Sequence, residues 1–280
     1  MKHSWGPEDL NDPNMPPEIR AIMERIMNQP FGKAKDNSSL PPLKVPKPLP
    51  IGSPKLYTMK VTLLDVEPPI WRRFVAPSFM TLDHFHSLLQ EVMGWKHAHA
   101  FAFEIGKNRF TLHDVGFSVD SMWDTEPSYN AADYELCQLI KPGTEILYEY
   151  DFGDGWKHEI IVENDTSNEY QKYCFYCVEG ERACPPEDCG GPGGYEHLLE
   201  ILADPEHPEH DEKIEWLKFC GYRYGKFDSE KFDPDTCNRA LKVRRPSSSS
   251  DDRAKQATVY KQKKQERKRK EAAKKRNRKR

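Results

Sequence analysis

An acidic and imidazole-bearing turn stands out in the run YEYDFGDGWKHEI at residues 148–160. Aromatic and β-branched residues alternate with polar ones on both sides of a Gly-Asp-Gly step, which is typical of a β-hairpin. The run gathers Asp151, Asp154 and His158. Carboxylates and an imidazole at one turn can bind a divalent cation or transfer protons. Turn chemistry is the competing interpretation, because an Asp near Gly bonds its own backbone.

A second polar segment, CPPEDCGGPGGY at residues 184–195, adds two carboxylates and two thiols. Its prolines and glycines predict a loop free of helix and strand. The carboxylates either cap the following segment or present oxygens to a cation. The glycine pairs resemble a phosphate-binding loop only in composition, since no Lys-Ser/Thr follows them. The two segments together supply five candidate catalytic residues: Asp151, Asp154, His158, Glu187 and Asp188.

Four cysteines form a candidate zinc site with the spacing C-x2-C-x6-C-x4-C. Four thiolates suit tetrahedral zinc, and zinc would order a loop rich in Pro and Gly. The spacing differs from the paired knuckles of a zinc ribbon, so ordinary reduced thiols are the competing interpretation. The four candidate ligands are Cys174, Cys177, Cys184 and Cys189. Zinc is the one cofactor that the sequence suggests.

Histidines offer an alternative ligand set. His97 and His99 alternate along a predicted strand and would share one face, from which two imidazoles can chelate a metal. His158 is the third candidate of this set. A half-buried pair packed in a polar seam is the more common outcome for such histidines.

The same segments carry a family resemblance. The hairpin run, the run CPPEDCGGPGGYEHLL, the earlier WRRFVAP and GWKHAHAF, and the late FDPDTCNRAL together resemble the plasmid pRiA4b ORF-3-like family. The similarity is ordered along residues 55–241, which is longer than a chance motif match. The resemblance implies a single compact α+β domain and an association with insertion elements. It implies no particular reaction.

The apolar patterns indicate which elements position these side chains. Period-two alternation predicts strands at residues 55–65, 70–75 and 97–105, and the two-stranded hairpin at residues 146–163. Helical spacing and capping residues predict helices at residues 81–94, 133–140, 195–203, 208–219 and 234–243. Strands come first and helices mostly later. This order favours an α+β fold: one compact domain with a mainly antiparallel sheet and helices on one side.

The domain is expected at residues 55–245, with an extension at each end. Residues 1–54 are rich in proline and are expected to form a flexible extension. Within it, apolar residues recur at helical spacing over residues 17–27, so a short amphipathic helix is expected there and is a candidate site for a protein partner. Residues 246–280 comprise a Ser-rich hinge and a tail expected to be disordered.

The last 20 residues contain 13 Lys or Arg and 2 Glu, whereas the whole chain has a formal charge of −3. Such a block cannot bury a core, and nucleic acid is the obvious polyanion to bind it, because neutralised phosphates release counterions. A solubilising tail that folds back on its own acidic domain is the competing interpretation. The expected nucleic-acid-binding residues are Lys263, Lys264, Arg267, Lys268, Arg269, Lys270, Lys274, Lys275 and Arg276.

Neither a membrane span nor an apolar signal segment is visible, so a cytoplasmic protein is expected, or a nuclear one in a eukaryotic host. The sequence favours a non-enzymatic accessory protein of mobile elements that contacts nucleic acid non-specifically through its tail. Two alternatives stay open. One is a metal-dependent hydrolase with its site at the hairpin of Asp151, Asp154 and His158. The other is a protein-interaction module that uses the helix at residues 17–27.

Overall fold

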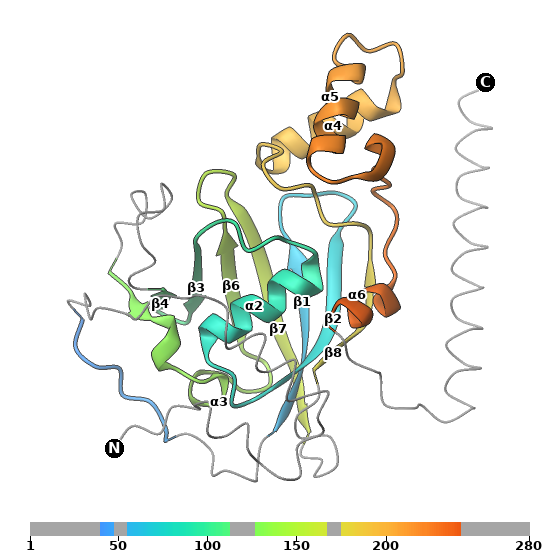
Figure 1. Cartoon of the computed structure of the whole chain (residues 1–280). Helices are drawn as coiled ribbons and strands as arrows, with labels where there is room; N and C mark the ends of the chain where they lie inside the picture. Colours follow the sequence, from blue (N-terminus) through green and yellow to red (C-terminus); the bar gives the residue numbers. More distant parts are fainter. Residues whose placement is uncertain (1–39, 48–54, 113–126, 167–174, 242–280) are drawn as a thin grey trace, which may run out of the picture. The chain divides into compact units, whose positions relative to one another are not determined.

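The computed structural model describes residues 40–47, 55–112, 127–166 and 175–241. They build an α+β domain around one eight-stranded sheet with the strand order β5-β4-β3-β6-β7-β1-β2-β8 (Figure 1). Neighbouring strands are antiparallel except for the parallel pair of β4 and β5. The predicted fold class is confirmed. The strands are β1 (Leu56–Leu63), β2 (Ile70–Pro77), β3 (Phe101–Ile105), β4 (Asn108–Thr111), β5 (Tyr129–Asn130), β6 (Glu145–Tyr150), β7 (Trp156–Thr166) and β8 (Tyr176–Glu181).

The helices serve two different parts of the domain. In Figure 1, α2 crosses one face of the sheet, while α4 and α5 pack together beyond one end of the strands. Within the described ranges, no helix has the length and apolar content to cross a membrane. The helical segments are α2 (Leu82–Met93), η3 (Ala131–Asp133), α3 (Leu136–Leu139), α4 (Gly191–Ala203), α5 (His210–Phe219), η4 (Arg223–Gly225) and α6 (Pro234–Ala240).

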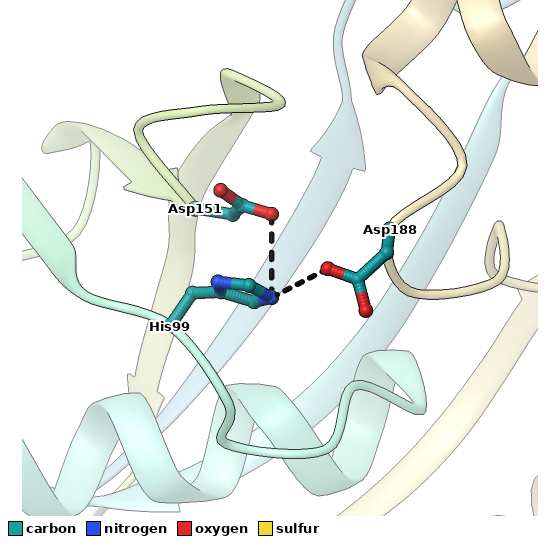
Figure 2. Close-up of side chains that lie close together, drawn as sticks. All are labelled: His99, Asp151 and Asp188. Carbon is teal, nitrogen blue, oxygen red and sulfur yellow. Dashed lines mark ion pairs between the residues drawn. The ribbon is translucent and has the colours of Figure 1, made fainter. Parts of the chain in front are cut away.

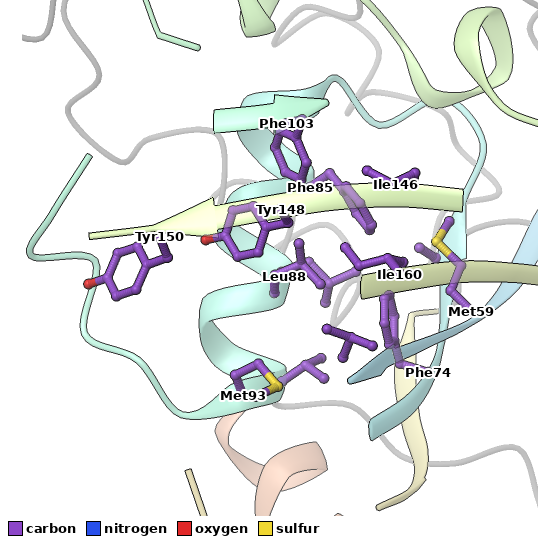
Figure 3. Packing of buried hydrophobic residues seen from close by; sticks show 14 of the residues in the cluster. Met59, Phe74, Phe85, Leu88, Met93, Phe103, Ile146, Tyr148, Tyr150 and Ile160 are labelled. Carbon is purple, nitrogen blue, oxygen red and sulfur yellow. The ribbon is translucent and has the colours of Figure 1, made fainter. Parts of the chain in front are cut away.

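The core lies between α2 and the central strands. The apolar residues of α2 recur every three or four positions, so one stripe of the helix faces the sheet. Phe85 from this stripe packs on Phe103 of β3 with ring centroids 5.6 Å apart, and Phe103 stacks on Tyr148 of β6 at 4.8 Å (Figure 3). All three side chains are fully buried. Large buried aromatic rings of this kind contribute strongly to stability and fix the helix over the sheet.

The predicted hairpin is confirmed and sets the position of the candidate site. β6 and β7 pair with Tyr148 opposite His158 and Tyr150 opposite Trp156. The inward positions of β7 alternate as the sequence indicates, and Trp156, His158 and Ile160 are all fully buried. This register leaves residues 151–155 as the turn, at the edge of the core.

Several parts of the secondary structure differ from the expectations, and the short strands β4 and β5 were not expected. The strand expected at residues 97–105 begins at Phe101, because the preceding backbone amides bond to side chains rather than to a neighbouring strand. The helix expected at 133–140 is a 3-10 turn followed by the short α3. Strand β8 was not predicted: among the described strands it pairs with β2 alone, and its sequence YCVEGE lacks a sustained apolar alternation.

Candidate functional site

The segment that follows α2 bonds through its backbone amides to side chains of the domain. It places His99 beside the hairpin turn. Gly94, with φ of 106°, ends the helix in the left-handed region that glycine tolerates best. The Lys96 amide donates to Glu187 Oε1 (2.6 Å), and the His97 amide donates to a glutamine side chain of α2 (2.8 Å). The Ala98 amide donates to the Tyr150 hydroxyl (3.0 Å). These bonds fix the segment that presents the next side chain, His99.

The hairpin turn contributes Asp151 through its own backbone geometry. Asp151 has φ of 56°, a conformation that Asp and Asn adopt more readily than other non-glycine residues. Its Oδ1 accepts the amides of Gly153 (3.0 Å) and Asp154 (3.1 Å). This is an Asx-type turn, in which an Asp side chain accepts amides of the residues that follow it. Turn chemistry was expected of Asp154, which precedes Gly155, but in the structure Asp151 makes these bonds. The turn leaves Asp151 Oδ2 directed at His99 Nε2, 3.5 Å away.

The loop that follows β8 docks onto this turn. The Gly190 amide donates to Asp154 Oδ2 (3.0 Å). A Cβ atom at Gly191 would lie 2.3 Å from the Asp154 carbonyl oxygen, so only glycine permits this approach. The loop was expected to be free of helix, but α4 begins at Gly191, because Gly190 takes the left-handed N-cap and Pro192 fits the first helical turn.

Three ligand-type side chains meet where these segments converge (Figure 2). His99 Nε2 lies 3.5 Å from Asp151 Oδ2 and 3.1 Å from Asp188 Oδ1. The three ligand atoms all lie within 4.8 Å of one another. Ligands on one cation with bonds of about 2.1 Å are separated by about 3.0 Å in octahedral and about 3.4 Å in tetrahedral geometry. The distances are therefore compatible with one bound divalent cation.

Glu187 stands next to this group. Its side chain is 5% exposed, and Oε1 accepts the Lys96 amide and the Tyr150 hydroxyl (3.0 Å). Oε2 has no hydrogen-bond partner among the described residues and lies 3.9 Å from His99 Nε2. A buried carboxylate oxygen without a hydrogen bond is energetically costly, which points to a group that is bound there.

Burial also sets the electrostatics of the site. Burial raises the pKa of Asp151, and it raises the pKa of Glu187 in the same way. Asp188, in contrast, has a side chain that is 68% exposed, so the site opens to solvent on that side. A cation would favour the ionised form of both buried carboxylates, so cation and proton compete for the same oxygens.

The structure places the other predicted histidines elsewhere. His158, predicted on the hairpin, faces the core: Trp95 Nε1 donates to its Nε2 (3.3 Å), and its Nδ1 donates to the Tyr148 carbonyl (3.2 Å). Burial lowers the pKa of His158 to about 4, so it is neutral at pH 7. His97 packs edge-on against buried His86 at 5.6 Å. The prediction that His97 and His99 share a strand face is wrong, because His97 has φ of 57° and lies outside β3.

The described cysteines do not assemble a zinc site in this structure. Cys177 lies on β8, and its thiol contacts backbone carbonyls. Burial raises the pKa of Cys184 and of Cys189, the latter to about 12, so neither thiol ionises readily. Within the described ranges, their sulfur atoms form no group with ligand spacing. Cys174 lies outside the described residues, so the four-thiolate site stays a prediction.

The predicted contacts with macromolecules also lie outside the described residues. This holds for the amphipathic helix at residues 17–27 and for the basic residues of the tail. Both stay predictions from the sequence.

His158 makes stability depend on pH. The folded state holds it neutral with a pKa near 4, whereas the unfolded value is 6.5, so its contribution is present above pH 6.5 and is lost as pH falls toward 4. At pH 5 this loss is about 2 kcal/mol. We expect His158→Gln to cost about 1–3 kcal/mol at pH 7 and to flatten the pH dependence of urea unfolding between pH 7 and 5. A slope equal to that of the wild type would contradict this role.

Gly191 tests the docking of the loop on the turn. Gly191→Ala places a Cβ against the Asp154 carbonyl in a left-handed conformation, so the loop must shift and carry Asp188 away from His99. We expect a loss of about 1–3 kcal/mol and of any thermal shift on adding Mn²⁺. Gly193→Ala is the matched control, because nothing lies within 4 Å of its added Cβ. Equal behaviour of the two variants would refute the docking contact.

A family model and two relatives match most of the domain. Residues 55–236 match the family described as plasmid pRiA4b ORF-3-like protein. The chain is 37% identical over 186 residues to the uncharacterized protein y4hQ of Sinorhizobium fredii, covering 65% of this chain and 89% of the relative. It is also similar to the crystal structure of a protein of unknown function, MM3350, from Methanosarcina mazei Go1, with a TM-score of 0.55 and 31% identity over 66% of this chain and 98% of that one. The match covers more than half of the sequence, and the chain belongs to the plasmid pRiA4b ORF-3-like family.

Proposed function

We propose that this protein binds a divalent cation at His99, Asp151 and Asp188 and uses it for hydrolysis. The observation that carries the proposal is the convergence of three segments far apart in sequence on one set of ligand atoms within 4.8 Å. This is the arrangement that the hydrolase interpretation of the sequence requires. It favours that interpretation over the non-enzymatic one.

Charge balance supports a cation rather than a simple ion pair. Asp151, Glu187 and Asp188 all lie within 3.9 Å of His99 Nε2. A protonated imidazole supplies one positive charge against three carboxylates, and two of these carboxylates are 5% exposed. A divalent cation neutralises the cluster more fully, because charges in a low-dielectric setting interact strongly.

The ligand set supports hydrolysis as the type of reaction. Three protein ligands leave coordination positions for water, as catalytic metal sites do and closed structural sites do not. A cation held by these residues would lower the pKa of a bound water and so supply a nucleophile near neutral pH. One imidazole with carboxylate oxygens suits Zn²⁺, Mn²⁺ or Fe²⁺ better than a soft thiolate-preferring metal. The exposed side of Asp188 gives a substrate access to the site.

We also propose that the basic tail associates with nucleic acid non-specifically, in keeping with an accessory role in a mobile element. The excess of Lys and Arg in the last 20 residues supports it. Phosphate neutralisation by such a tail needs no folded interface and reads no sequence.

Cation binding should be directly measurable. We expect Mn²⁺ or Zn²⁺ to raise the melting temperature of the protein after chelator treatment, and His99→Gln and Asp188→Asn each to abolish that shift. His197→Gln and Asp211→Asn are matched controls on α4 and α5, where both side chains are exposed. Isothermal titration calorimetry should give a stoichiometry near one in the controls. No heat and no thermal shift in the wild type would eliminate the site.

Removal of residues 251–280 should abolish most DNA and RNA binding, because most of the basic residues of the expected tail lie there. The domain should stay folded, since this segment offers few apolar residues to a core. Fluorescence anisotropy at several salt concentrations measures both the affinity and its steep salt dependence. Equal affinity of the full-length and truncated proteins would rule out the tail as the binding element.

A further inference from the structure

We propose that Glu187 accepts the proton of the water that attacks the substrate, and that Tyr150 and the Lys96 amide hold it in position for this step. The inference rests on the proposed cation site and assigns a role to the one buried carboxylate beside it. The reaction is a hydrolysis, in which water is the second reactant.

Glu187 is held by one oxygen and presents the other. Its Oε1 accepts the Lys96 amide (2.6 Å) and the Tyr150 hydroxyl (3.0 Å). Two hydrogen bonds to one oxygen fix the plane of the carboxylate. The other oxygen, Oε2, then points toward His99 with no hydrogen-bond partner among the described residues. A ligand or general base needs this combination of fixed orientation and a free acceptor.

Tyr150 is itself fixed as the donor in this arrangement. The Ala98 amide donates to the Tyr150 hydroxyl, so the hydroxyl hydrogen is directed to Glu187 Oε1. Burial raises the pKa of Tyr150 above its usual value, so the phenol keeps its proton. The Ala98 amide therefore donates to Tyr150, and Tyr150 donates to Glu187. Tyr150 positions Glu187 in this way and takes no part in the proton transfer.

The spacing favours a base over a fourth ligand. The three ligand atoms of His99, Asp151 and Asp188 form a group within 4.8 Å, and Glu187 is not a member of it. Its Oε2 lies 3.9 Å from His99 Nε2, farther than either aspartate oxygen. A base that takes a proton from a cation-bound water must stand one water molecule away from the cation, outside the ring of ligands.

The reaction balances without a redox partner. Glu187 Oε2 takes one proton from water, the remaining hydroxide forms a bond to the carbonyl carbon or phosphorus of the substrate, and the bond to the leaving group breaks. The proton on Glu187 then passes to the leaving group, which restores the carboxylate.

The test separates the base from the ligands. Glu187→Gln and Asp188→Asn are compared with Glu200→Gln on α4, whose carboxylate is exposed. Each protein is titrated calorimetrically with Mn²⁺ and Zn²⁺. Each is then assayed against bis(4-nitrophenyl) phosphate, 4-nitrophenyl phosphate and 4-nitrophenyl acetate from pH 5 to 9. Tyr150→Phe tests the positioning of Glu187, because it removes one hydrogen bond to Glu187 and leaves the carboxylate itself unchanged.

We expect Glu187→Gln to keep cation affinity within about threefold while hydrolysis falls by roughly 10²–10⁴-fold, the usual contribution of a general base. Tyr150→Phe should lower the rate less and keep the cation. Asp188→Asn should lose both cation and activity, and Glu200→Gln should match the wild type.

Other outcomes overturn the inference in distinguishable ways. Loss of the cation in Glu187→Gln would make Glu187 a ligand and would leave the proposed function standing. A Glu187→Gln variant as active as the wild type would remove the role as base and leave the proposed function standing. A cation-loaded wild type that hydrolyses none of the three probes would remove the role as base together with the hydrolytic part of the proposed function, and would leave only cation binding. Failure of the wild type to bind either cation would refute the proposed function itself.

Discussion

A buried carboxylate requires hydrogen-bond donors, and the way Glu187 obtains them holds the candidate site together. Its Oε1 accepts hydrogen bonds from the Lys96 amide, in the segment after α2, and from the Tyr150 hydroxyl, at the end of β6. The loop after β8 is thereby tied to two elements that the core already fixes. Asp154 adds a second tie, because it bonds the Gly190 amide. With both ties in place, the loop places the neighbouring Asp188 with its Oδ1 3.1 Å from His99 Nε2.

The domain shows how environment divides one residue type between two roles. His86 and His158 are fully buried among aromatic side chains, and burial lowers the pKa of both. Each makes neutral hydrogen bonds that suit a core. His99 lies among carboxylates at the edge of the same core. Of these three histidines, His99 is the one that combines several carboxylate neighbours with partial exposure, a setting that suits a metal ligand.

Most of the fold could be predicted from local patterns. The apolar stripe on α2 and the apolar alternation on β7 are clear signals in the sequence, because each element buries one face in the core. The short strands β4 and β5 were missed because they contain 4 and 2 residues, too few for a period to show. β8 was missed because its register depends on pairing with β2, a contact distant in sequence.

The sequence by itself determined which residues could do chemistry, and Asp151, Glu187, Asp188 and His99 were all among its candidates. It could not tell which of them meet, because spacing along the chain does not measure distance across turns and loops. Asp154 and His158 look equivalent to Asp151 in the hairpin run, yet one bonds the loop and the other enters the core. Only tertiary structure decided this, since the left-handed turn at Asp151 and the docking of Gly191 on Asp154 bring three distant segments to one point.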